Sequence, residues 1–185
     1  DETKIKWDEA LFKYAQKGKE LQFEPKTIVD AIYRPYFKQH LYFNKELNWS
    51  RYLMPSFFPK GHDNIAICVN GSAGQKEFSV SITSHIVDRS SIGAGQCFPL
   101  YWYEENKNPQ ATLFDDAETD KYIRRDGITD WILKEVRSRF GGSKAITKEH
   151  IFYYVYGLLH SRQYRERFVD DLKKSLPRIP IVDNV

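Results

Sequence analysis

The segment from Ser84 to Gln96 gathers polar side chains of the kinds that hydrogen-bond to the edges of DNA bases. Arginine can donate two hydrogen bonds to guanine, and glutamine can form a matching pair with adenine. The segment follows a strand-like stretch, and a loop on a rigid scaffold is a common position for binding residues. We therefore predict base contacts from five of its side chains: His85, Arg89, Ser90, Ser91 and Gln96. A solvated surface loop has a similar composition, so both interpretations stay open.

A second candidate reading segment is Asn70 to Gly74, whose sequence NGSAG lies between two strand-like stretches and is typical of a hairpin turn. The tip of a hairpin can enter a DNA groove, and the flanking residues Gln75 and Lys76 carry polar groups suited to contacts there. A plain turn is the alternative interpretation.

Positive charge is concentrated in two parts of the sequence, although the formal net charge is only +3. Residues 33–60 carry five basic side chains against one acidic side chain, and residues 144–180 carry eight against four. Residues 104–126 carry seven acidic side chains against four basic ones. This polarity predicts one basic face for DNA phosphates and an acidic segment directed elsewhere. Within residues 33–60 the predicted phosphate contacts are Arg34, Lys38, Arg51 and Lys60.

The sequence lacks the motifs that would indicate an enzyme. It has no Gly-x-x-x-x-Gly-Lys-Ser/Thr phosphate loop, no Asn-Pro-Pro-Tyr segment and no strand followed by a glycine-rich cofactor turn. Asp171 and Lys173 match the Asp-x-Lys end of a Mg²⁺-nuclease signature, but they fall on a charged helical stretch without a second carboxylate strand. The histidines and cysteines have no zinc-ligand spacing. We therefore expect no catalytic and no metal-binding residue in this chain.

The elements that position these segments form two groups. After a short helix that ends near Gly18, the first half is rich in predicted strands: Thr27–Tyr33, Phe37–Phe43, Asn64–Val69, Lys76–Ile82 and Phe98–Tyr103. In the fourth strand Phe78, Val80 and Ile82 alternate with polar residues, which predicts a half-buried strand. Pro55 and Pro59 make any helix at residues 49–58 short or broken.

The last third is predicted to be entirely helical. Thr129 caps one helix, which Gly141 and Gly142 end. Thr147 caps a second helix, in which one face is predicted to be core and Phe152, Tyr153 and Tyr156 lie on the other side, so that both sides are covered. Ser161 begins a third helix. The sequence therefore predicts an α+β fold with a β-rich N-terminal half and a helical C-terminal third.

Length and composition fit one globular domain. With 185 residues, of which 41% are hydrophobic, the chain can bury roughly 70% of its unfolded surface. No apolar run approaches the ~18 residues of a membrane span. We expect a helical lead-in at 1–26, a DNA-reading part at 27–103, a polar loop at 104–127 and a helical buttress at 128–180. Because the chain begins at Asp1 and has only two cysteines, Cys68 and Cys97, we expect a fragment of a cytoplasmic protein.

Three separated motifs resemble one known family. They are IYRPYFKQHLYF at Ile32–Phe43, FPLYWY at Phe98–Tyr103, and Ile151–Pro180 with its aromatic run, Leu-His-Ser break and Leu-Pro-Arg-Ile-Pro exit. The family is the C-terminal target-recognition region of Type ISP restriction-modification enzymes, and the resemblance covers about Ile28 to Pro180. Members more often have Asp where Phe37 stands and Arg where Gln39 stands, so only Arg34 inherits a role from the first motif.

This resemblance implies a function. Such enzymes are single polypeptides that combine a nuclease, a helicase-like motor, an adenine methyltransferase and a DNA-reading domain. It implies that this chain reads a short asymmetric site in double-stranded DNA and has no catalytic activity or cofactor of its own. S-adenosylmethionine, ATP and Mg²⁺ would act in the neighbouring methyltransferase and motor domains. The alternative is a scaffold that docks those two domains together and touches DNA little, which the large aromatic helical third supports.

Overall fold

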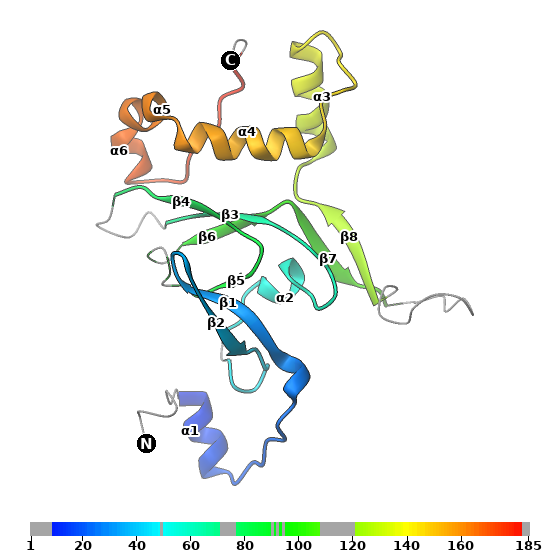
Figure 1. The fold of residues 1–185 in the computed structure, drawn as a ribbon, viewed down its shortest axis with the longest axis vertical. Coiled ribbons are helices and arrows are strands. Elements are labelled where there is room, and N and C mark those ends of the chain that lie inside the picture. The colour runs from blue at the N-terminus through cyan, green and yellow to red at the C-terminus, as the bar shows by residue number, and fades with distance from the viewer. Residues whose placement is uncertain are drawn as a thin grey trace, which may run out of the picture.

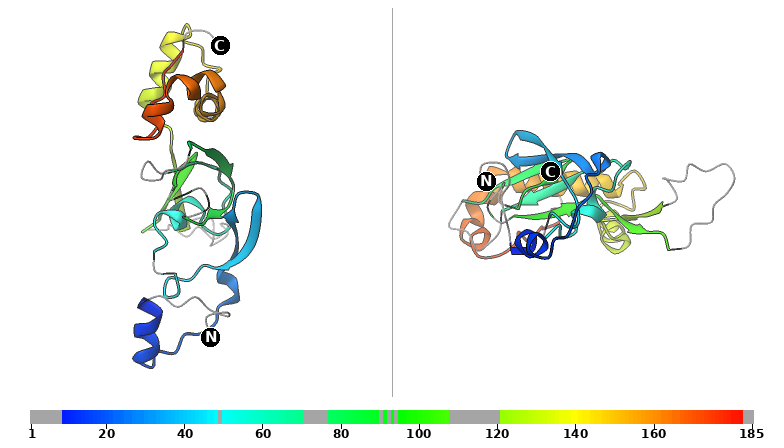
Figure 2. Two further views of the ribbon diagram at one scale, coloured as in Figure 1. Left: turned by 90° about the vertical axis from the view of Figure 1, so that its left-hand side faces the viewer. Right: turned by 90° about the horizontal axis from the view of Figure 1, so that it is seen from below.

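The computed structural model describes residues 9–48, 50–70, 77–89, 91, 93, 95–107 and 121–182. The molecule is elongated, with two three-stranded sheets and a two-stranded ribbon in the middle, helix α1 (Glu9–Gln16) at one end and the C-terminal helices at the other (Figure 1). The view turned about the vertical axis shows the same three tiers (Figure 2, left). The predicted α+β class is confirmed, because strands dominate the first half and helices the last third. No helix in the described ranges has the length and apolar character needed to cross a membrane.

The first sheet has the strand order β2-β1-β5. Strands β1 (Ile28–Arg34) and β2 (Phe37–Tyr42) pair antiparallel through a tight turn in which Tyr36 has a φ of 64°. Strand β5 (Ile86–Val87) pairs with β1 in parallel. This strand was not predicted, because two residues are too few to produce a periodic pattern in the sequence.

The second sheet has the order β4-β3-β6, with all pairs antiparallel. Its central strand β3 (Ala66–Val69) is buried along its whole length, between β4 (Val80–Thr83) and β6 (Gln96–Pro99). The half-buried character predicted for the fourth strand is confirmed for Phe78 and Val80, which pack against the core, but it is wrong for Ile82, which is exposed.

A corner at the buried residue Leu100 separates β6 from β7 (Tyr101–Glu105), so the single strand predicted over residues 98–103 is in fact two. Strand β7 pairs with β8 (Tyr122–Asp126) to form a two-stranded ribbon. The prediction of a polar loop was therefore wrong for these five residues of β8. Most of β8 is exposed, and it carries charged side chains such as Arg125, which pairs with Glu104 of β7 at 3.1 Å. Residues 108–120 lie outside the described ranges.

Four helices follow: α3 (Asp130–Arg139), α4 (Lys148–His160), α5 (Arg162–Arg167) and α6 (Val169–Leu172). The predicted caps are confirmed, since the Thr129 hydroxyl accepts from Ile132 N and the Thr147 hydroxyl accepts from His150 N. Helix α4 lies across the second sheet (Figure 1). The main core lies between them and contains Ile67, Val69, Leu100, Phe152, Leu159, Tyr164 and Leu172.

Two helical predictions need correction. Phe152 belongs to the core at 2% exposure, whereas its neighbour Tyr153 is 53% exposed, so α4 is not covered on both sides. Helical periodicity gives the spacing of apolar residues, but it does not tell which side of an aromatic-rich helix meets the sheet. The helix expected from Ser161 is interrupted at Phe168, between α5 and α6.

Candidate nucleic-acid interface

A hollow of about 620 Å³ lies between the first sheet and the edge of the second sheet. Its walls come from β1, β2, the segment around α2 (Met54–Phe57), the loop after β5 and the start of β6. Four residues predicted from the sequence as DNA contacts line it: Arg51, Arg89, Ser91 and Gln96. The fold therefore brings together side chains that are up to 45 positions apart in the sequence.

The position of Arg89 is fixed by backbone hydrogen bonds on both sides of the loop after β5. Asp88 N donates to Ile32 O of β1 at 2.9 Å, which anchors the entry to the loop. Gly95 N donates to Arg89 O at 3.3 Å, which closes the loop at its base. The loop turns through Gly93, whose φ of 75° is readily adopted by glycine. Arg89 is exposed, so its guanidinium can reach a ligand above the hollow.

Aromatic side chains form another part of the wall of the hollow. The guanidinium of Arg51 lies 5.4 Å from the centre of the Phe43 ring, which holds its charge beside the hollow. Tyr52 follows with a φ of 48°, an uncommon conformation for a residue other than glycine, and is 65% exposed. Tyr33 also lines the hollow. The site thus combines cations with apolar ring faces, a combination that suits nucleotides.

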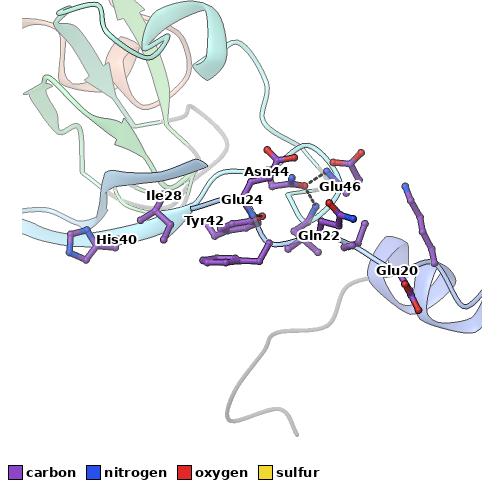
Figure 3. A pocket seen from close by; sticks show the side chains of 12 residues that line it. Glu20, Gln22, Glu24, Ile28, His40, Tyr42, Asn44 and Glu46 are labelled. Carbon is purple, nitrogen blue, oxygen red and sulfur yellow. Dashed lines mark hydrogen bonds between the residues drawn. The ribbon is translucent and has the colours of Figure 1, made fainter. Parts of the chain in front are cut away.

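Lys38 does not line this hollow, because successive side chains of β2 point to opposite faces of the sheet. Gln39, Leu41 and Phe43 line the hollow, so Lys38 shares the opposite face of β2 with His40 and Tyr42. A second hollow lies on that face, between β2 and residues 19–24 (Figure 3). Its lining includes the carboxylates Glu20, Glu24 and Glu46. Phosphates are repelled by carboxylates, so this face is the less favourable one for DNA.

Arg34 is engaged within the protein. Its guanidinium stacks on the Tyr33 ring at 4.1 Å, and it forms an ion pair with Asp88 at 3.7 Å. Both side chains of the pair are nearly half exposed, so the pair contributes little to stability. It does place a cation at the entry of the loop that carries Arg89. The predicted phosphate contact of Arg34 therefore stays a prediction. Its ion pair with Asp88 also helps to position the loop after β5.

The other predicted residues lie elsewhere. Lys60 is exposed in the turn after α2. His85 is held in a turn before β5, where its backbone N donates to the Thr83 hydroxyl and its ring Nδ1 lies 2.9 Å from the Ser84 hydroxyl. Gln75, Lys76 and Ser90 lie outside the described residues, although the antiparallel pairing of β3 with β4 confirms the hairpin that Gln75 and Lys76 flank.

Sequence reasoning missed Gln39, which lines the hollow beside Leu41. Alternation along β2 was the available signal, but it does not indicate which face meets the loop after β5. No cluster of three or more His, Cys, Asp or Glu side chains that could hold a metal occurs within the described ranges. Lys173 of the candidate nuclease pair instead forms an ion pair with Asp170 at 3.3 Å.

A family model described as the Type ISP C-terminal specificity domain matches residues 1–185. No curated protein matches the chain. Among solved structures, the chain is similar to part of the DrdV–DNA complex, with a TM-score of 0.82 and 35% identity over 96% of this chain and 16% of that one.

Two further solved structures are similar. One is the ATP-dependent Type ISP restriction-modification enzyme LlaBIII bound to DNA, with a TM-score of 0.77 and 27% identity over 96% of this chain and 11% of that one. The other is a nuclease-deletion mutant of the Type ISP enzyme LlaGI in complex with a DNA substrate mimic, with a TM-score of 0.71 and 33% identity over 97% and 14% of the two chains. The chain thus spans less than a fifth of each of these polypeptides.

Proposed function

The chain belongs to the family of Type ISP C-terminal specificity domains, and on this premise we propose that it recognises a specific sequence in double-stranded DNA. The observation that carries the proposal is the hollow in which Arg51, Arg89, Ser91 and Gln96 meet. Arginine and glutamine are the side chains that read guanine and adenine with paired hydrogen bonds. DrdV and LlaBIII are bound to DNA in the similar structures and LlaGI to a DNA substrate mimic, which supports the same class of ligand.

In the proposed mechanism, positioning and reading are separate tasks. Arg51, with Lys60 and Arg34 outside the hollow, holds the phosphates and so fixes the register of the duplex without selecting a sequence. Arg89 and Gln96, which are exposed and line the hollow, would supply the contacts to the base edges. Their positions depend on the backbone hydrogen bonds that anchor the loop after β5 and on the pairing of β6 with β3.

We propose that the chemical steps belong to other parts of a longer polypeptide, an ATP-dependent restriction-modification enzyme that uses S-adenosylmethionine, ATP and Mg²⁺. The 185-residue chain is expected to show no nuclease, ATPase or methyl-transfer activity, because its sequence lacks the motif for each. Incubation with duplex DNA and Mg²⁺ tests this expectation. Cleavage that disappears in Asp171→Ala would contradict it.

The first test of DNA binding is its dependence on salt. The 185-residue chain is expected to bind mixed-sequence duplex with a Kd on the order of 10⁻⁴ to 10⁻⁶ M, because phosphate contacts dominate non-specific binding. The affinity should fall steeply between 50 and 200 mM salt, as counterions compete for the phosphates. Titration by fluorescence anisotropy measures both. An affinity that does not change with salt would favour the alternative, a scaffold that docks neighbouring domains.

The second test compares Arg89→Ala with Lys60→Ala in the complete enzyme. Arg89→Ala is expected to cost ~1–3 kcal/mol on the cognate site and to relax the preference at one base position, since a base contact is lost. Lys60→Ala should weaken binding to all sequences alike, because it removes a phosphate contact. Sequencing the methylated sites in cells that carry each variant distinguishes the two roles. An unchanged site in Arg89→Ala cells would exclude Arg89 as a base-reading residue.

A further inference from the structure

Cys68 of β3 and Cys97 of β6 lie directly opposite each other in the second sheet. The register of hydrogen bonds defines the type of this pair. Leu100 N donates to Ile65 O at 2.8 Å, and bonded and non-bonded pairs alternate along an antiparallel ladder. Ile65 and Leu100 are therefore a hydrogen-bonded pair. The pairs then alternate, so Cys68 and Cys97, three positions further along, are a non-hydrogen-bonded pair. At such pairs the two Cα atoms are closest, about 4.5 Å apart.

This placement matches the geometry of a disulfide. A disulfide needs Cα atoms about 4.4–6.8 Å apart and side chains that point toward each other, which directly opposed residues on one face of a sheet provide. Both cysteines are free thiols, and their side chains are within hydrogen-bonding distance of each other. The hydrogen bond with Cys97 and burial hold the pKa of the Cys68 thiol well above its ordinary value.

The two thiols differ in their access to solvent. Cys68 is 1% exposed in the centre of the sheet, whereas Cys97 is only partly buried and lines the hollow next to Gln96. A small reagent that enters the hollow therefore meets Cys97 first. The raised pKa of Cys68 keeps that thiol protonated, which adds to its protection because the thiolate is the reactive form.

We propose that Cys68 and Cys97 are an oxidation site, at which a hydroperoxide converts the two thiols into a cross-strand disulfide. Cys97 attacks one peroxide oxygen, the O–O bond breaks, and the leaving oxygen takes up the thiol proton, which leaves Cys97 as a sulfenic acid. The Cys68 sulfur then attacks the Cys97 sulfur. An S–S bond forms, the S–O bond breaks, and the departing hydroxide takes the Cys68 proton as water. The two thiols lose two electrons and the peroxide gains two.

The experiment treats the folded 185-residue chain with hydrogen peroxide, blocks remaining thiols with N-ethylmaleimide, and maps peptides by mass spectrometry without reduction. The expected result is loss of both free thiols and one linked peptide pair containing Cys68 and Cys97, which dithiothreitol separates. The fraction of oxidised chain that carries the Cys68–Cys97 link should be smaller in guanidinium chloride, where the sheet no longer holds the two thiols opposite each other. A linked fraction that is equal or larger in the unfolded chain would overturn the proposal.

Two matched variants assign the order of the steps. In Cys97→Ser, Cys68 should stay a free thiol at the same peroxide dose. In Cys68→Ser, the sulfenic acid of Cys97 should persist and react with dimedone. If Cys68→Ser does not fold, the linked peptide of the unsubstituted chain and the result for Cys97→Ser still test the proposed disulfide. Over-oxidation of Cys97 while Cys68 stays free, or a dimer linked through two Cys97 residues, would refute the site.

Discussion

Replacing Gly127 with alanine is expected to lower the free energy of unfolding by about 3 kcal/mol or more. A Cβ atom at this position would lie 2.1 Å from Pro99 O and 3.0 Å from Leu100 O. Both are backbone atoms at the corner between β6 and β7, and Gly127 N also donates to Leu100 O at 2.7 Å. The overlap cannot be relieved by rotating a side chain, so the corner itself must shift. Urea denaturation followed by tryptophan fluorescence measures the change.

Gly157→Ala is the matched control. Gly157 lies in α4, and nothing comes within 4 Å of the position its Cβ would take. Because alanine has the higher helix propensity, this substitution should stabilise the protein by ~0.5–1 kcal/mol. The opposite signs of the two changes separate close backbone approach from a general effect of adding a methyl group. A loss below 1 kcal/mol for Gly127→Ala would mean that the corner adapts freely.

Asn64→Ala is expected to cost about 3–4 kcal/mol, since several buried groups lose their partner at once. Asn64 is 6% exposed. Its Nδ2 donates to Phe57 O at 2.7 Å and to Tyr101 O at 2.6 Å, and its Oδ1 accepts from Ile65 N at 2.9 Å and from Tyr101 N at 3.1 Å. One side chain thus joins α2, the entry to β3 and the start of β7. Thermal and urea unfolding both report this loss.

Asn44→Ala makes the same chemical change at a local turn. The Asn44 Oδ1 accepts from Glu46 N at 2.7 Å and from Leu47 N at 3.2 Å, and all three residues belong to one short stretch of chain. Its partners are only partly buried, so water can replace the lost bonds, and the expected cost is ~1 kcal/mol or less. Equal losses for the two variants would show that Asn64 has no special role in joining the elements.

The parts of the fold predicted correctly are those encoded by neighbouring residues. Thr129 and Thr147 cap helices because a hydroxyl and an amide three residues later satisfy each other, which the sequence alone reveals. Strands β5 and β8 were missed for the opposite reason. Each is defined by its pairing with a distant strand, β1 or β7; β5 is only two residues long, and β8 has no buried residue that would impose alternation.

The candidate site, too, was predicted from the sequence only in part. Residue types suited to DNA indicated Arg51, Arg89, Ser91 and Gln96, and the fold gathers these four around one hollow. Whether a residue of β2 faces that hollow depends on how β1 lies between β2 and β5. That arrangement is long-range, so the sequence did not separate Gln39, which lines the hollow, from Lys38 on the opposite face.

The short parallel contact between β5 and β1 has a consequence for how specificity can change during evolution. The chain leaves the second sheet after β4, pairs with β1 over two residues, and returns to the second sheet as β6. The segment between Asp88 and Gly95 therefore bridges two sheets whose registers are set by other strands. Substitutions within this bridge can accumulate without altering either sheet. Under the proposed function, a lineage would acquire new DNA targets by mutating a few bridge residues while its architecture persists.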